Sequence, residues 1–98
     1  MEKAREATDL ANLRAAYAEC SAAVLTGENT GKATVATDGS ASATIDVTQK
    51  KKDWTGDNAN AKIGTKPVKE NVMKKDGVKQ MTVTIAADGT VALADVDQ

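Results

Sequence analysis

The sequence predicts an α+β domain in which one amphipathic helix packs on an antiparallel sheet of four short strands. The first observation is a change of apolar period, from 3.6 residues over residues 2–26 to two residues in short segments after residue 32. The second is composition: of 98 residues 41% are apolar, many of them alanine, and the only aromatic residues are Trp54 and Tyr17. So little apolar volume builds a thin core, which suits a single domain over residues 1–98.

The helix is expected over residues 2–26, because this stretch lacks Gly and Pro and is rich in Ala, Leu, Glu and Arg. Its larger apolar residues follow steps of three and four, which places them on one face: Leu10, Leu13, Tyr17, Cys20 and Val24. We expect further residues to broaden that face: Ala7, Ala11, Ala18, Ala22 and Leu25. The charged first two turns are expected to have little to bury against the domain, and Gly27 is expected to end the helix.

Four segments have the strand pattern. Residues 43–48 and 81–85 alternate apolar and polar side chains, which predicts strands with one wet face, and 32–36 and 90–93 are shorter candidates. The dipeptides Asp38-Gly39 and Asp88-Gly89 are turn signals between paired strands.

The middle of the chain, residues 50–78, follows neither period and is expected to be irregular. Pro67 can open a turn or a short helix in which Val68 and Val72 share a face. The candidate ligand-contact loop consists of Lys50, Lys51, Lys52 and Trp54. Trp54 either stacks on a base or sugar or anchors the loop to the domain, and the lysines either contact a ligand or are simply solvated.

Several chemistries are excluded or disfavoured by composition. The chain has no His and a single Cys, so a histidine base, a disulfide within the chain and a structural zinc site are impossible. Cys20 lies on the apolar helix face and is expected to be a buried thiol. A loop cluster of oxygen ligands is either a calcium site or, as we expect, a hydrophilic turn: Asp53, Asp57, Asn58 and Asn60. We therefore expect no enzyme activity, no cofactor and no metal.

Charge is segregated along the chain, although the formal net charge is only −1. Residues 1–49 hold four bases and seven acids, residues 50–79 hold nine lysines and four acids, and the remainder holds three acids and no base. A basic middle between acidic ends can attract copies of the same chain, whereas the alternative is a solvated lysine-rich loop.

Residues 2–19, EKAREATDLANLRAAYAE, resemble the second half of the long N-terminal helix of type IV pilins, most closely the pilin-like proteins of Gram-positive bacteria. Residues 83–91, VTIAADGTV, loosely resemble the last hairpin of such proteins, and the middle of the chain resembles nothing in the family. The resemblance implies a helix on a four-stranded antiparallel sheet. The apolar half-helix, leader and cleavage site of the family are not among these 98 residues.

The resemblance implies a structural subunit of an extracellular type IV pilus or related surface or secretion filament. The apolar half-helix would anchor the precursor in the cytoplasmic membrane and later bundle non-covalently with those of other subunits in the filament core. The isolated domain is expected to be a monomer. Candidates for ion pairs between subunits are Lys3, Arg5, Glu6 and Asp9, and the alternative for them is a solvated helix surface.

Two other functions stay open on sequence grounds. One is a minor pilin or pseudopilin that binds DNA, a host surface or a secretion substrate through the lysines and Trp54. The other is an unrelated small secreted α+β binding or inhibitor module.

Overall fold

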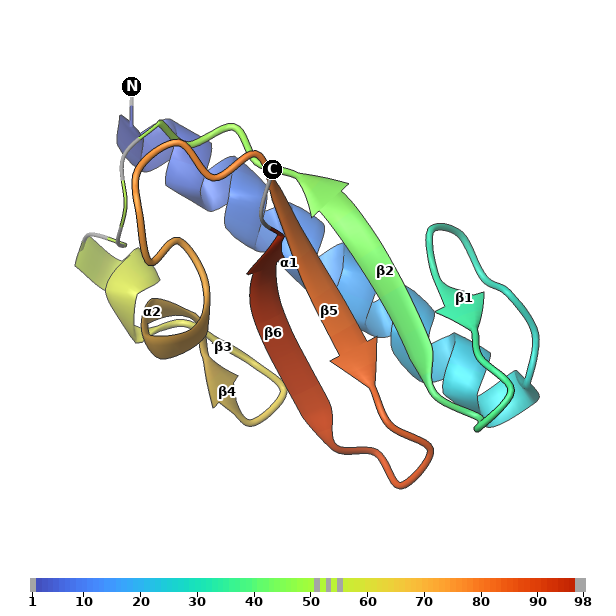
Figure 1. The fold of residues 1–98 in the computed structure, drawn as a ribbon. Helices are drawn as coiled ribbons and strands as arrows, with labels where there is room; N and C mark the ends of the chain where they lie inside the picture. The colour runs from blue at the N-terminus through green and yellow to red at the C-terminus, as the bar shows by residue number, and fades with distance from the viewer. Residues whose placement is uncertain (1, 51, 53, 55, 97–98) are drawn as a thin grey trace.

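The computed structural model describes residues 2–50, 52, 54 and 56–96 (Figure 1). Helix α1 (Glu2–Thr26) lies on a four-stranded antiparallel sheet, so the predicted α+β fold is confirmed. The strands of this sheet are β1 (Thr34–Val35), β2 (Ala41–Asp46), β5 (Gln80–Ile85) and β6 (Val91–Val96). The intervening elements are η1 (Gly56–Asn60), β3 (Lys62–Ile63), β4 (Lys66–Pro67) and α2 (Val68–Asn71).

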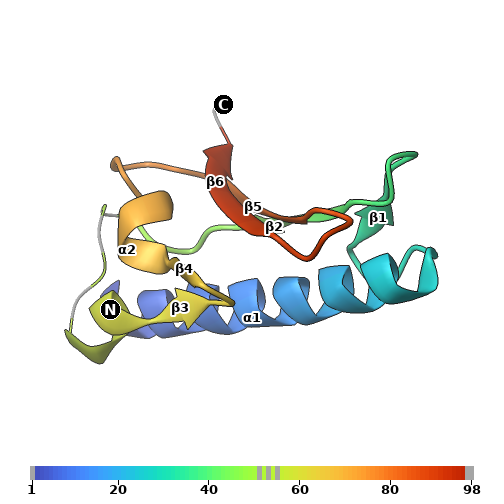
Figure 2. The same ribbon diagram turned by 90° about the horizontal axis from the view of Figure 1, so that it is seen from below.

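The sheet has the order β1-β2-β5-β6, and α1 covers one of its faces (Figure 2). β2 and β5 pair along their whole length, from Ala41 opposite Ile85 to Asp46 opposite Gln80. The strand expected over residues 43–48 therefore begins and ends two residues earlier. It ends there because the backbone N–H groups of Thr48 and Gln49 turn away to α1, where they donate to Asp9.

The core lies between α1 and the sheet. α1 contributes Leu13 and Cys20, which are fully buried, together with Leu10, Ala16 and Ala23. β2 and β5 contribute their inward residues, Ala41, Ala43, Ile45, Met81, Val83 and Ile85. Tyr17 and Val24 are half-buried at the margin. The larger apolar residues of the helix thus face the sheet as predicted.

The expected broadening of this face was wrong for most of the residues named. Ala7, Ala11, Ala18 and Leu25 are exposed, and Ala22 is half-buried. Residues two apart in an α-helix are separated by about 200°, so Ala11 lies opposite Leu13 and Ala18 opposite Cys20. Glu6, Asp9, Ala16 and Ala23 take the inward positions instead.

The segment expected to be irregular is organised into short elements around a second group of buried side chains. α2 begins directly after Pro67, as the helix alternative predicted, and Val68 and Val72 are fully buried. The other buried apolar residues of this segment are Trp54, Ile63, Met73 and Val78. The spacing of apolar residues in the sequence did not reveal this organisation. No element of the segment exceeds five residues, which is too short to show a period.

Two similar Asp-Gly turns lie at the same end of the sheet. Ala36 N–H donates to the Ser40 carbonyl over 2.8 Å, and Ala86 N–H donates to the Thr90 carbonyl over 2.9 Å. Gly39 and Gly89 occupy the left-handed region with φ of 88° and 94°, which other residues rarely adopt. The Asp38 carboxylate accepts from the hydroxyl and backbone N–H of Ser40, and Asp88 accepts from the backbone N–H of Thr90.

These hydrogen bonds favour the ionised carboxylates, so the pKa of Asp38 and the pKa of Asp88 both lie below the usual 3.8. A carboxyl whose pKa is lower when folded stabilises the fold above its unfolded pKa of about 3.9 and loses that contribution as pH falls through the folded value.

The double variant D38N/D88N keeps side-chain acceptors for both turns but cannot titrate. We expect its melting temperature to depend less on pH between about pH 5 and pH 3 than that of the parent. An unchanged slope in circular-dichroism melts would contradict the assigned role of these turns.

The core makes a second prediction, on stability. Leu13→Ala removes a fully buried side chain, and we expect it to lower the free energy of unfolding by about 2–5 kcal/mol. The matched control is Leu25→Ala in the same helix, where the side chain is 87% exposed and a change within about 0.5 kcal/mol is expected. Urea unfolding of the two variants measures the difference, and equal losses would refute the packing of α1 on the sheet.

Candidate functional site

The most unusual surface is the outer face of α1, which we call the alanine face. It carries exposed alanines at steps of three and four: Ala4, Ala7, Ala11, Ala15 and Ala18, with half-buried Ala22 and exposed Leu25 completing the row. From Ala4 to Leu25 the row is about 30 Å long. A water-facing helix surface normally carries charged or polar side chains, so a row of small apolar ones is a candidate packing surface.

The first turns of α1 are tied to the domain by Asp9, which is fully buried. Its Oδ1 accepts hydrogen bonds from the backbone N–H of Thr48 at 2.8 Å and from the Thr48 hydroxyl at 2.9 Å. Its Oδ2 accepts from the backbone N–H of Gln49 at 3.0 Å. The Thr48 hydroxyl also lies 3.2 Å from the Arg5 carbonyl. Three donors compensate the carboxylate for its loss of water.

This arrangement corrects the expectation that the first two turns have little to bury and carry intersubunit ion pairs. Asp9 and Glu6 are not on the surface, since Glu6 is 1% exposed and its Oε1 lies 3.4 Å from the Asn58 amide nitrogen. Arg5 is half-buried. The side chain of Lys3 lies outside the described residues. Asp9 and Glu6 thus contribute to the domain interior.

The structure also changes the interpretation of the candidate ligand-contact loop. Trp54 is 3% exposed and its indole N–H donates to the Val72 carbonyl at 3.2 Å, so it anchors the loop, as one of the two alternatives predicted. It therefore presents no face to a base or sugar. Lys50 and Lys52 are exposed, and the backbone N–H of Lys52 donates to Asp76 at 2.7 Å. Lys51 lies outside the described residues.

One hydrogen-bond cluster was not anticipated from the sequence. The carboxylate of half-buried Asp95 on β6 accepts from the backbone N–H groups of Met73 at 2.8 Å and Lys74 at 3.0 Å. Met73 has a positive φ of 57°, and two bonds to one carboxylate hold this backbone conformation. The partners are more than 20 residues apart in the chain. No local motif identifies them.

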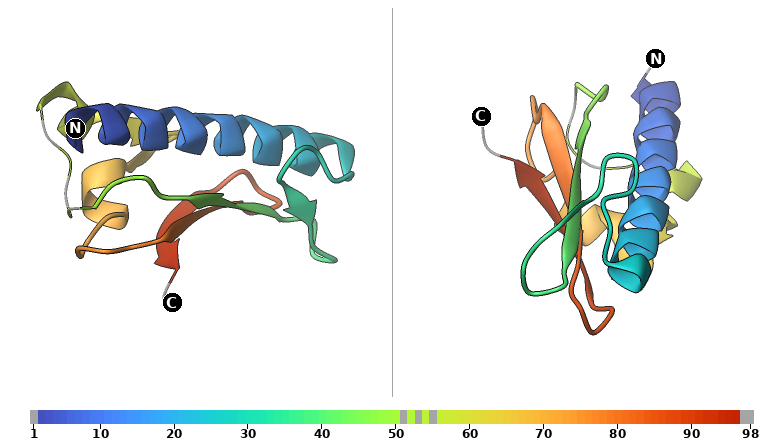
Figure 3. Two further views of the ribbon diagram at one scale, coloured as in Figure 1. Left: turned by 90° about the horizontal axis from the view of Figure 1, so that it is seen from above. Right: turned by 90° about the vertical axis from the view of Figure 1, so that its right-hand side faces the viewer.

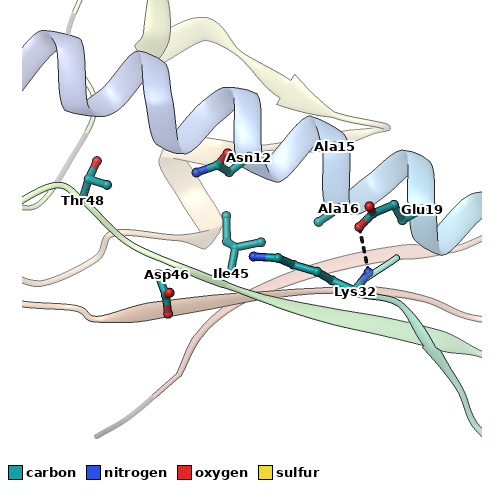
Figure 4. Close-up of a pocket in the computed structure, with 8 residues that line it drawn as sticks. All are labelled: Asn12, Ala15, Ala16, Glu19, Lys32, Ile45, Asp46 and Thr48. Atoms are coloured by element: carbon teal, nitrogen blue, oxygen red, sulfur yellow. Dashed lines mark hydrogen bonds between the residues drawn. The ribbon is translucent and has the colours of Figure 1, made fainter. Parts of the chain in front are cut away.

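A groove with polar and apolar lining runs between α1 and β2 (Figure 4). Asn12 and Glu19 line it from the helix and Asp46 from the strand, with Lys32 reaching in from the loop between them. The Glu19 carboxylate accepts from the backbone N–H of Lys32 at 3.2 Å, which fixes that loop on α1. Gly31 has a φ of 56°, in the left-handed region that favours glycine, and a Cβ there would displace this carboxylate. The groove therefore contains groups that hold the loop on α1.

Cys20 is fully buried, and its thiol lies 3.7 Å from the Val83 carbonyl oxygen. Burial, and secondarily the nearby Glu19 carboxylate, raise the pKa of this thiol, so it stays protonated and a poor nucleophile. The prediction of a buried structural thiol is confirmed.

No three metal-binding carboxylate or thiol side chains gather within the described part of the chain. Of the residues considered as calcium ligands, Asp53 and the side chain of Asp57 lie outside that part, and Asn58 lies at Glu6. In the same part of the chain, no helix combines the length and hydrophobicity that a bilayer crossing requires.

Comparison with protein-family models, curated proteins and solved structures finds no match to the chain.

The Asp9 cluster makes a third prediction. Asp9→Asn replaces one carboxylate oxygen with an amide N–H₂ that faces a backbone donor, either that of Thr48 or that of Gln49. We expect a loss of about 1.5–3 kcal/mol in the free energy of unfolding, the range for hydrogen bonds to charged groups. Asp46→Asn on the exposed end of β2 is the control and should change stability little. Urea unfolding measures both, and a neutral Asp9→Asn would contradict the structural role of this carboxylate.

Proposed function

We propose that this chain is the head domain of a structural subunit of a type IV pilus-like filament, located outside the cell. The observation that supports this best is the alanine face of α1, which is suited to packing against helices of neighbouring subunits. Together with the resemblance of residues 2–19 and the helix-on-sheet fold, it favours an assembly function over a catalytic one.

The composition of the alanine face favours close helix packing. Alanine has no side chain beyond Cβ, so a neighbouring helix can approach the backbone closely along the whole row. Alanine also loses no side-chain conformational entropy when a neighbour buries it, whereas the lysines and glutamates of an ordinary exposed face do. The occupant that fits is the α1 helix of a second copy, as expected for identical subunits around a common axis.

The opposite face of the molecule supports the same orientation. Along β2 and β5 the outer side of the sheet carries polar side chains, and Thr44 and Thr82 share a hydrogen bond of 3.1 Å across these strands. A polar sheet is suited to water and an alanine row to burial. We therefore place α1 toward the filament axis and the sheet toward solvent.

The direction of α1 fits a longer subunit. Its first turn lies at one end of the long dimension of the molecule (Figure 3). An apolar half-helix of the kind that the resemblance implies would continue the axis of α1 away from the head. It would hold the precursor in the membrane and pack in the filament core, where burial of its apolar surface drives assembly.

The alternative of a minor subunit that binds DNA or another ligand receives less support. Its proposed contacts were Trp54 and the adjacent lysines, and with Trp54 buried only the lysines remain for an anion. We therefore retain the filament subunit as the proposed function.

Variants of the full-length subunit test this proposal in cells that build the filament. Ala11→Arg and Ala15→Arg should abolish or strongly reduce filaments seen by electron microscopy, because each places a long charged side chain on the packing face. Both positions are exposed, so melting of the purified variants should stay near that of the parent. Thr44→Arg, exposed on the sheet, is the control and should leave filaments intact. Normal filaments from both helix variants, with loss in the sheet variant, would reverse the proposed orientation.

A further inference from the structure

The lysine-rich segments of the chain meet at one end of the sheet. Asp46 pairs with Gln80 at this end, so the segments that follow β2 and precede β5 lie side by side. They are joined by a hydrogen bond from Val47 N–H to the Lys79 carbonyl, 2.8 Å, and by the bond between Lys52 N–H and Asp76. We call this the lysine end, defined by its exposed side chains Lys50, Lys52, Lys74, Lys75 and Lys79.

The carboxylates at the lysine end accept hydrogen bonds from other groups of the domain. Asp76 accepts from Lys52 N–H, and Asp95 accepts from the N–H groups of Met73 and Lys74. Asp46 accepts from the Gln80 amide at 3.3 Å. Segments 47–52 and 74–79 contain six lysines, which the three carboxylates Asp46, Asp76 and Asp95 offset only in part, so that a charge of +3 is left.

The other end of the sheet is acidic. The register of β2 and β5 places Ala41 opposite Ile85, so the two Asp-Gly turns lie side by side there. A Cβ on Gly39 would lie 3.3 Å from the Ala87 side chain, which shows how closely the turns approach. Residues 36–40 and 86–90 contain Asp38, Asp88 and no base. We call this the aspartate end. Both aspartates are fully exposed. Because the pKa of each lies below 3.8, both are ionised at neutral pH.

Helix α1 adds to this separation of charge. Its N-terminus lies at the lysine end, because Arg5 and Asp9 contact Thr48 just beyond β2. Its C-terminus lies toward the aspartate end, and its last turn carries no basic residue to offset the partial negative charge of the helix terminus. The positive end of the dipole of this 25-residue helix therefore lies at the lysine end, and its negative end lies toward the aspartate end.

We propose that the two ends are complementary docking surfaces, so that the lysine end of one copy binds the aspartate end of the next copy head to tail. Charge complementarity identifies the second copy as the occupant, since the chain carries both signs on opposite ends of a molecule 38 Å long. A head-to-tail contact does not close on itself and leads to an open line of copies. Exposed ion pairs are individually weak, so the isolated domain stays monomeric when dilute and associates when concentrated.

The contact does not depend on the proposed filament function, because it uses the ends of the sheet and not the alanine face. If a filament does form, the head-to-tail contact would order the heads along it, while the helices supply the main apolar burial. The two surfaces can therefore be tested separately on the same protein.

The experiment measures self-association of the 98-residue chain by ¹⁵N–¹H NMR at concentrations up to about 1 mM, the range in which weak association is detected. Amide shifts at residues 47–52, 74–79, 36–40 and 86–90 should move together with concentration. Raising salt from about 0.01 M to about 1 M shortens the screening length from about 30 Å to about 3 Å and should abolish the shifts.

Two charge variants make the test specific. K74E/K79E reverses exposed charges at the lysine end, and T37K/D38N/A87K/D88N reverses the aspartate end while retaining the turn acceptors. Each variant alone should associate at least about fivefold more weakly than the parent, whereas their equimolar mixture should recover the association because opposite charges meet again. Charge-preserving K74R/K79R is the control and should associate like the parent.

Three results would overturn the proposal: no concentration-dependent shifts at low salt, shifts confined to the alanine face, or no recovery in the mixture. Anionic phospholipid vesicles and a DNA duplex are added as competing ligands. Binding of either at the lysine end without any self-association would replace the second copy as the occupant. Loss of filaments in the alanine-face variants, by contrast, bears only on the proposed function.

Discussion

The buried carboxylate of Asp9 joins the two layers of the domain. It lies on the first turns of α1 and accepts three hydrogen bonds from Thr48 and Gln49, which follow β2 directly. This cluster ends the strand, turns the chain onto the helix and fixes the beginning of α1 against the sheet. Without these donors the buried charge would be strongly unfavourable, so the position of α1 and the end of β2 are specified together.

The middle of the chain depends on this arrangement. Thr48 and Gln49 are held on α1, and farther along the chain Trp54, Val68 and Val72 lie in a second buried group. The carboxylate of Asp95 then fixes Met73 and Lys74 against β6. Two buried or half-buried carboxylates thus position the backbone that the thin alanine-rich core cannot position by packing alone.

The sequence predicted the elements that have a clear period. α1, β5 and the two Asp-Gly turns lie where the pattern placed them, because each depends on neighbours within a few residues. It misplaced the outer alanines, since Ala11 and Ala18 are apolar and were assigned to the core although they lie about 200° from Leu13 and Cys20. It also assigned Glu6 and Asp9 to the surface, because a charged residue is seldom buried unless distant partners compensate it. Those partners, Asn58, Thr48 and Gln49, are some 40 or more residues away.

These misassignments have one functional consequence. With Glu6 and Asp9 inward and the alanines outward, the outer face of α1 carries a row of small apolar side chains, which we have proposed as the surface that packs against a second copy. Among the exposed charges, those of the lysine end and the aspartate end lie at opposite ends of the sheet, because the register of β2 and β5 separates them. In the proposed assembly, apolar contact along the side of the molecule and ionic contact along its length would act in different directions, so neither would compete with the other. In the proposed assembly, packing of helices would set how tightly copies associate, and the charged ends would set their order and polarity. Complementary charge typically provides specificity more than affinity.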